Sequence, residues 1–127
     1  FDQRIIKSNW FRYFKKNNVK LHVRSIFLQK ILLSDLDKLP TYFHRWKRNF
    51  KNFNTFCYNN KISKLDACFN YIYQFKNIQA IVIGIDNFSQ INDIMNIKVS
   101  INKNILKDLN SFCVKDLKLI DPRNWKF

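Results

Sequence analysis

The chain contains one glycine, Gly84, at the point where an apolar run gives way to a polar one. The residues before it, AIVI, favour a strand, and those after it, DNFSQ, favour the start of a helix. A lone glycine at such a junction marks a sharp turn or a close approach to the backbone. Asp86 and Asn87 follow directly, and their side chains either cap the helix or meet a ligand. The chemistry that these residues predict is binding at a strand-to-helix turn.

Cysteine and histidine show no spacing that predicts a metal site. Cys57, Cys68 and Cys113 have no paired spacing, and His22 and His44 lie far from all three in the sequence. We therefore expect neither zinc nor a disulfide framework, and unpaired cysteines favour a reduced, intracellular protein. No stretch approaches the ~18 apolar residues of a membrane span, and no signal-peptide pattern is present. These features predict a cytoplasmic protein without a membrane partner.

The formal charge of +14 suggests a nucleic-acid partner, because basic surfaces attract phosphates. A simpler cause is the composition, since Lys, Asn, Ile and Phe supply 63 of the 127 residues and their codons are rich in A and T. The basic residues are also scattered along the chain and do not form one stripe. Nucleic acid is therefore not the expected partner, and a small basic nucleic-acid-binding module is kept as the alternative function.

Apolar periodicity predicts alternating helices and strands. We expect a helix after Ser8 ending in 15–18, a strand over 19–29, a long helix after Pro40, a helix after Ser63, a strand over 80–85, a helix from about Phe88 with Ile91, Ile94 and Met95 inward, and a helix near 101–112. This alternation is typical of a parallel α/β sheet in one domain. Two strands cannot form a whole sheet of this kind, because parallel strands need neighbours on both sides.

The segments HVRSIFLQKILL and KLDACFNYIYQFKNIQAIVIGIDNFSQI, in this order and spacing, resemble the C-terminal third of the aldo/keto reductase family. These oxidoreductases are built on a (β/α)8 TIM barrel. The resemblance covers roughly residues 1–97, from the end of the sixth barrel strand at FDQR through the last two strands and their helices. Residues 98–127 would then be the C-terminal extension of the same single domain. The chain begins with Phe1 and its sole methionine is Met95, so we expect a piece of a longer protein, incomplete on its own.

The resemblance implies a nicotinamide cofactor across the C-terminal mouth of the barrel. The loop after the eighth strand would hold its adenosine end, where exposed helix N–H groups suit phosphate. Gly84 and Ile85 would let the backbone approach the cofactor. Asp86 and Asn87 would line the helix start, and Gln90 and Asp93 would face the adenine and ribose.

The loop after the seventh strand would contact the other part of the cofactor. The family usually reads Ser-Pro-Leu-x-Gln-Gly-Leu-Leu there, and residues 25–32 of this chain read SIFLQKIL. The resemblance implies that Ser25, Phe27 and Gln29 contact the cofactor near its pyrophosphate and that Arg24 stacks on the nicotinamide. Lys30 replaces the usual glycine, which makes close approach of the loop backbone less certain; the lysine could instead pair with a phosphate.

The implied function is NAD(P)-dependent reduction of aldehydes or ketones, with a small carbonyl compound as substrate. The catalytic Asp, Tyr, Lys and His of the family lie on earlier strands and match no residue here, so the chain alone is expected to be inactive. From Asn77 to Ile97 there is no Lys or Arg, while Asp86 and Asp93 are negative. Because a carboxylate repels the 2′-phosphate of NADP, the pattern favours NAD over NADP.

Overall fold

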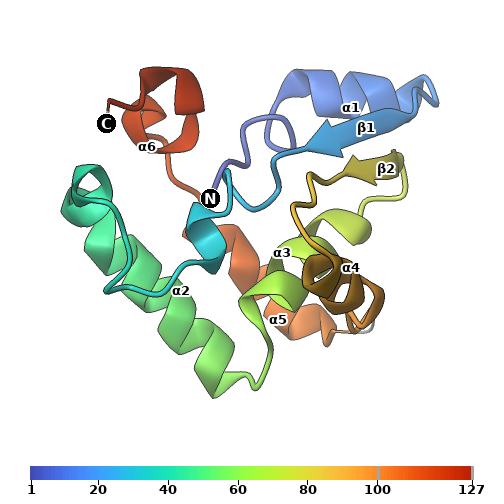
Figure 1. Ribbon diagram of the computed structural model, residues 1–127. Helices are drawn as coiled ribbons and strands as arrows, with labels where there is room; N and C mark the ends of the chain where they lie inside the picture. Colours follow the sequence, from blue (N-terminus) through green and yellow to red (C-terminus); the bar gives the residue numbers. More distant parts are fainter. Residues whose placement is uncertain (100, 127) are drawn as a thin grey trace.

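The computed structural model describes residues 1–99 and 101–126, in which helices supply most of the regular structure (Figure 1). In chain order the elements are α1 (Asn9–Lys16), β1 (Leu21–Arg24), η1 (Ile31–Leu33), η2 (Thr41–Trp46), α2 (Lys47–Asn59), α3 (Lys64–Tyr73), β2 (Ile78–Val82), α4 (Phe88–Met95), α5 (Lys103–Asp108), η3 (Leu109–Phe112), α6 (Leu117–Ile120) and η4 (Pro122–Asn124), where η denotes a 3₁₀ helix.

β1 and β2 form a two-stranded parallel sheet, and the chain passes through α2 and α3 between them. His22 pairs with Ala80 and Arg24 with Val82. This β-helix-β order confirms the predicted α/β class. The first strand is shorter than the predicted 19–29, because only Leu21–Arg24 is extended and paired. The second strand begins and ends earlier than the predicted 80–85, at Ile78–Val82.

The first strand ends early because its backbone leaves the extended region. Ser25 has φ 59°, and Leu28 and Gln29 have φ 49° and 51°. L-residues in this left-handed region do not continue a strand. Residues 25–30 therefore form a loop, and the apolar side chains of Phe27 and Leu28 are buried from this loop.

The starts of α1 and α3 were predicted correctly because their signals are local, whereas the long helix expected after Pro40 begins as the 3₁₀ helix η2 and becomes α-helical only at Lys47. The Ser8 hydroxyl accepts a hydrogen bond from the Phe11 N–H at 3.2 Å, and the Ser63 hydroxyl accepts one from the Asp66 N–H at 2.9 Å. Each side chain satisfies a backbone donor that the helix itself leaves unpaired. Both helices begin at the residue after the predicted cap.

The hydrophobic core lies between the helices. Its fully enclosed centre is Phe43, which is 0% exposed, and Phe50, Phe53 and Cys57 turn one side of α2 toward it. The core also takes in Ala67, Cys68 and Tyr71 of α3 and Leu109, Leu119 and Ile120 of the C-terminal segment. The described part of the C-terminal segment is therefore packed into the hydrophobic core.

An ion-paired carboxylate anchors the C-terminal end. Asp121 accepts hydrogen bonds from the Arg123 guanidinium at 2.6 and 2.9 Å, and Arg4 approaches the same carboxylate to 4.0 Å. The bonds from Arg123 lower the pKa of Asp121 to about 2. The Val114 N–H also donates to the Phe1 carbonyl at 3.1 Å, so the two ends of the chain are held together.

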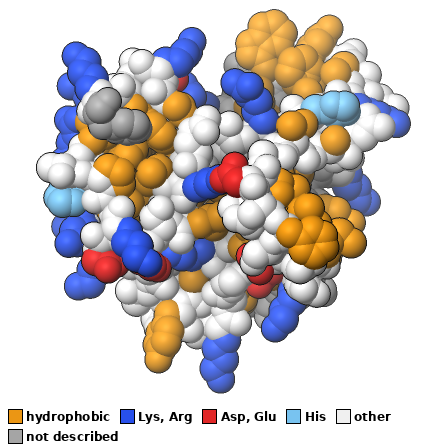
Figure 2. Space-filling view, viewed as in Figure 1, with side chains coloured by type: hydrophobic (Ala, Val, Ile, Leu, Met, Phe, Trp, Pro, Cys, Tyr) orange, Lys and Arg blue, Asp and Glu red, His pale blue; other side chains and the backbone are white. Residues whose placement is uncertain are grey.

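The sheet and α4 are poorly covered. No residue of either strand is buried, and no residue of α4 is buried. Met95 is 78% exposed, so the prediction that Ile91 and Met95 face inward was wrong. Apolar side chains gather over α1 and near α4 in the space-filling view (Figure 2). A helix buries an apolar face only where another layer packs on it, and α4 lacks that layer here.

The described helices offer no candidate for crossing a membrane, because none combines the required length with sufficient apolar character.

Candidate functional site

A groove of about 460 Å³ lies where the segments that follow the two parallel strands meet. The segment after β1 contributes Phe27 and Lys30, and the segment after β2 contributes Gly84. Residues 63–65 at the start of α3 and the side chains of Gln90 and Asp93 on α4 complete its walls. The groove therefore occupies the carboxyl edge of a parallel sheet, where α/β proteins bind ligands.

Gly84 is not required by the turn or by packing of the chain. Its φ is not positive, so the backbone there has a conformation open to any residue, and the interpretation as a sharp turn that needs glycine was wrong. A Cβ atom built at this position meets no atom within 4 Å. Because Gly84 also lines the groove, the missing side chain leaves open space for whatever enters it.

The start of α4 is held by side-chain capping. The Asn87 carbonyl oxygen Oδ1 accepts a hydrogen bond from the Gln90 N–H at 3.0 Å, and the Gln90 Oε1 accepts one from the Asp86 N–H at 2.9 Å. Asn87 thus caps α4, one of the two roles that the sequence allowed for it, and the return bond of Gln90 reaches Asp86 instead of Asn87 itself. The Gln90 amide nitrogen forms no bond within the described chain and remains available in the groove wall.

An ion pair closes one end of the site. The Lys30 ammonium pairs with the Asp86 carboxylate, which joins the loop after β1 to the loop after β2. Both side chains are substantially exposed, so the pair contributes little to folding stability. The pair matters more for ligand binding than for stability. It neutralises the Asp86 carboxylate, and it engages Lys30, which was expected to be free to pair with a phosphate.

The ten predicted site residues do not share one cavity: four line the groove, three line a second cavity and three line neither. Phe27, Gly84, Gln90 and Asp93 line the groove. Arg24, Ser25 and Gln29 line a second, open cavity of about 960 Å³ beside the N-terminal segment. Ile85, Asp86 and Asn87 line neither cavity. The two loops thus meet at one edge, but only four of the predicted contacts share one concave surface.

Lys64 is a groove residue that the prediction missed. Its ammonium donates a hydrogen bond to the Ser34 carbonyl at 2.7 Å, which fixes a second cation beside Lys30 in the groove wall. The Ser63 cap places this side chain in the first turn of α3, but no sequence signal indicates that this turn meets the end of β2.

Lys30 occupies a backbone conformation that favours glycine. Its φ is 69°, in the left-handed region, at the position where the resembled family has glycine. We predict that Lys30→Gly raises the free energy of unfolding by about 0.5–1 kcal/mol, because the strain is relieved while the exposed ion pair contributes little. Urea denaturation measures the change.

Lys51→Gly in the middle of α2 is the matched control. It should lower the free energy of unfolding by about 1 kcal/mol, since glycine is a poor helix residue. An equal loss of stability in both variants would contradict the importance of the left-handed conformation at Lys30.

Two of the three cysteines, Cys57 and Cys68, are buried and unreactive. Burial raises the pKa of the Cys57 thiol to about 11 and that of Cys68 to about 12, so neither is a thiolate near neutral pH. All three cysteines are free. Within residues 1–99 and 101–126, no group of three His, Cys, Asp or Glu side chains is arranged to hold a metal ion.

Comparison with models of protein families, with curated proteins and with solved structures gives no match for this chain.

Proposed function

We propose that this chain is the C-terminal part of a (β/α)8 barrel of the aldo/keto reductase type and that its groove holds the adenosine end of a nicotinamide dinucleotide. The observation that carries the proposal is the position of Gly84. Gly84 lies past the carboxyl end of β2, in the wall of a groove that the loop after β1 also lines. No atom lies within 4 Å of a Cβ built at Gly84, so packing within the chain does not require glycine there. Parallel sheets and barrels bind cofactors at this edge.

The exposure of the sheet supports the barrel. Parallel strands are normally buried on both faces, whereas no residue of β1 or β2 is buried. The described chain pairs each strand only with the other, so each has an edge with unpaired backbone groups. Further barrel strands would pair with both edges, and an adjoining layer would cover the apolar side of α4.

The groove side chains suit an adenosine phosphate. The Gln90 amide and the Asp93 carboxylate can hydrogen-bond with the adenine and the ribose hydroxyls, and the apolar Phe27 can pack against the ring. Lys64 supplies positive charge for a phosphate. Lys30 is already paired with Asp86 and is therefore not free to bind a 2′-phosphate, which favours NAD over NADP.

The bound cofactor would supply a hydride for reducing an aldehyde or ketone. The proposed role of this chain is to bind and orient the adenosine end, because no residue matches the catalytic tetrad. The chain alone is expected to show no turnover with any carbonyl compound. We also propose a cytoplasmic location, because the three cysteines are free and thiols stay reduced in the cytoplasm.

The proposal predicts that filling the groove at Gly84 abolishes nucleotide binding. Gly84→Leu should weaken the binding of 5′-ADP by about tenfold or more, the result of losing roughly 1.4 kcal/mol of contact free energy. Isothermal titration calorimetry of the 127-residue chain measures it. A leucine at position 84 meets no protein atom near its Cβ, so the fold should be unaffected.

Ser89→Leu adds a similar side chain to an exposed position of α4 outside the groove wall. This control should bind 5′-ADP like the unchanged chain. Unchanged affinity in Gly84→Leu, or an equal loss in both variants, would show that the nucleotide does not occupy the groove.

A further inference from the structure

The outer side of α2 carries positive charge with no negative charge in the surrounding sequence. From Lys38 to Leu65 the chain has seven Lys or Arg residues and no Asp or Glu. Phe50, Phe53 and Cys57 turn one side of α2 into the core, and at about 100° per residue Arg48 and Lys51 fall on the other side of this helix, where both are exposed. Charges that are scattered in the sequence are therefore gathered on one surface by the helix.

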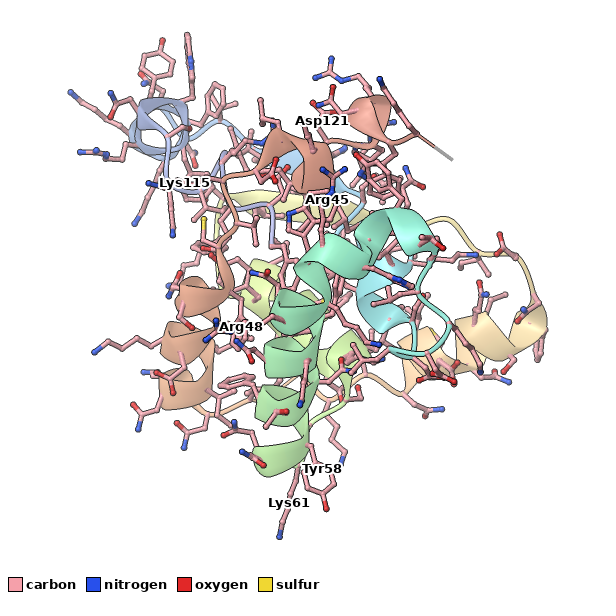
Figure 3. The ribbon with its side chains drawn as sticks, turned by 90° about the vertical axis from the view of Figure 1, so that its left-hand side faces the viewer. Arg45, Arg48, Tyr58, Lys61, Lys115 and Asp121 are labelled. Carbon is pink, nitrogen blue, oxygen red and sulfur yellow. The ribbon has the colours of Figure 1, made fainter. Side chains whose placement is uncertain are left out.

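We call this surface the basic face and define it by Arg45, Arg48, Lys51, Tyr58, Lys61 and Lys115, all of which are exposed. Figure 3 looks at this side of the molecule, with Arg45 of η2 above α2, Arg48 in the first turn of α2, Tyr58 near its lower end, Lys61 just beyond that end and Lys115 on the segment after η3. Among the ion pairs of the described residues, none involves a cation of the basic face.

The nearest carboxylates along the C-terminal segment are already in use. Asp116 accepts a hydrogen bond from the Trp46 indole N–H at 3.0 Å, and its other oxygen accepts one from the Lys118 N–H at 2.9 Å. Asp121 is held by Arg123 at 2.6 Å. Asp116 stays negative beside Lys115, but the five cations of the basic face outnumber it and none of them is in a salt bridge of the described residues, so the face keeps a net positive charge for a partner from outside the chain.

Planar groups are exposed along the same face. Tyr58 is 84% exposed and contributes no packing that would explain an aromatic residue. The Arg45 guanidinium carbon lies 4.3 Å from the centre of the Trp46 ring and 5.0 Å from that of Tyr42, so the side chain is held against aromatic rings. Both a tyrosine ring and an ordered guanidinium provide surfaces on which unpaired bases stack.

The composition of the face argues against a protein or a membrane. Protein interfaces need a desolvated apolar centre, and among the described residues of α2 Tyr58 is the one exposed large hydrophobic side chain, with Leu117 exposed on the neighbouring C-terminal segment. A helix that binds membranes inserts its apolar side into the lipid, but the apolar side of α2 is already buried in the core. Positive charge combined with exposed planar groups fits a flexible polyanion with bases.

We propose that the basic face binds single-stranded RNA through its phosphates, with bases stacked on Tyr58 and beside Arg45. A 13-residue helix is about 20 Å long, which suits a short oligonucleotide. This activity is separate from nucleotide binding in the groove, which is lined by none of the basic-face residues.

Fluorescence anisotropy with a labelled oligouridine of about 12 nucleotides, in the range of single-strand site sizes, tests the proposal on the 127-residue chain. The triple variant Arg48→Gln, Lys51→Gln and Lys61→Gln should weaken binding about tenfold or more at ~150 mM salt. It should also reduce the slope of log Kd against log salt concentration by about 2, since each phosphate contact on a single strand contributes about 0.7. Tyr58→Ala should weaken binding and leave this slope unchanged.

The matched control is the triple variant Lys15→Gln, Lys16→Gln and Lys20→Gln, which removes the same charge from exposed positions at and after the end of α1. It should retain the affinity of the unchanged chain to within about threefold, roughly the size of a weak exposed charge effect. An equal loss in both triple variants would overturn the proposal, because net charge alone would then explain binding. Absence of binding at ~150 mM salt, or displacement of the RNA by polyglutamate at equal charge concentration, would overturn it too.

Discussion

Replacing Phe43 with alanine should lower the free energy of unfolding by about 3–5 kcal/mol, the usual cost of removing a buried phenyl ring. The side chain is 0% exposed, and its ring lies 4.9 Å from that of Trp125 and 6.3 Å from those of Trp46 and Phe50, measured between centroids. The cavity would open at the point where η2, α2 and the C-terminal segment meet. Because domains are stable by only about 5–15 kcal/mol, much of the total is lost.

Urea denaturation followed by circular dichroism measures this loss. Tyr58→Ala removes a ring of similar size from a side chain that is 84% exposed, and it should change the free energy of unfolding by no more than about 0.5 kcal/mol. If Phe43→Ala were tolerated as well as Tyr58→Ala, the helical core would not be the centre of stability.

The second large effect concerns the choice between the two nicotinamide cofactors. We predict that Asp86→Ser combined with Gln90→Arg shifts binding toward 2′,5′-ADP, relative to 5′-ADP, by about 1–3 kcal/mol, the scale of a hydrogen bond to a charged group. The first change removes a carboxylate and releases Lys30 from its ion pair. The second places a guanidinium in the groove wall, where it can meet the 2′-phosphate.

These two nucleotides carry the parts in which NADP and NAD differ, so calorimetry on this chain is sufficient. The unchanged chain should bind 5′-ADP at least as tightly as 2′,5′-ADP. Asn92→Arg adds the same single charge as Gln90→Arg to an exposed position of α4 outside the groove, and Asp86→Ser combined with Asn92→Arg serves as the control, with a smaller change expected in the preference. A tenfold preference of the unchanged chain for 2′,5′-ADP, about 1.4 kcal/mol, would contradict the assignment to NAD.

Features that depend on neighbouring residues could be predicted from the sequence. The caps at Ser8, Ser63 and Asn87 follow from hydroxyl or amide oxygens placed three residues before a backbone N–H, and all three form. The parallel order of the two strands follows from the helices between them. These signals are local, and tertiary packing agrees with them.

Features that depend on the rest of the molecule could not be predicted. The strand over 19–29 ends at Arg24 because the backbone turns left-handed at Ser25, in a run of residues that otherwise favours extended structure. Periodicity also placed Met95 inward, whereas α4 has no layer to pack against. Arg24 and Gln90 were assigned to one site, but they line different cavities, and cavity shape depends on the packing of the whole chain.

The same limit applies to charge. In the sequence the seven basic residues of 38–65 form no continuous run, because apolar and polar residues stand between them. Only the helical fold of α2, which buries Phe50 and Phe53, reveals that Arg48 and Lys51 occupy a common outer surface.

The position of the adenosine end is tested most directly by mapping 5′-ADP on the ¹⁵N-labelled chain with two-dimensional ¹H–¹⁵N NMR. The groove account predicts that the largest concentration-dependent shifts occur at the amides of Phe27, Gly84 and Gln90, and that Gly84→Leu removes them. Shifts confined to the basic face would mean that the nucleotide is attracted by charge alone. That result, or the absence of shifts around Gly84, would contradict a cofactor site at the carboxyl edge of the sheet.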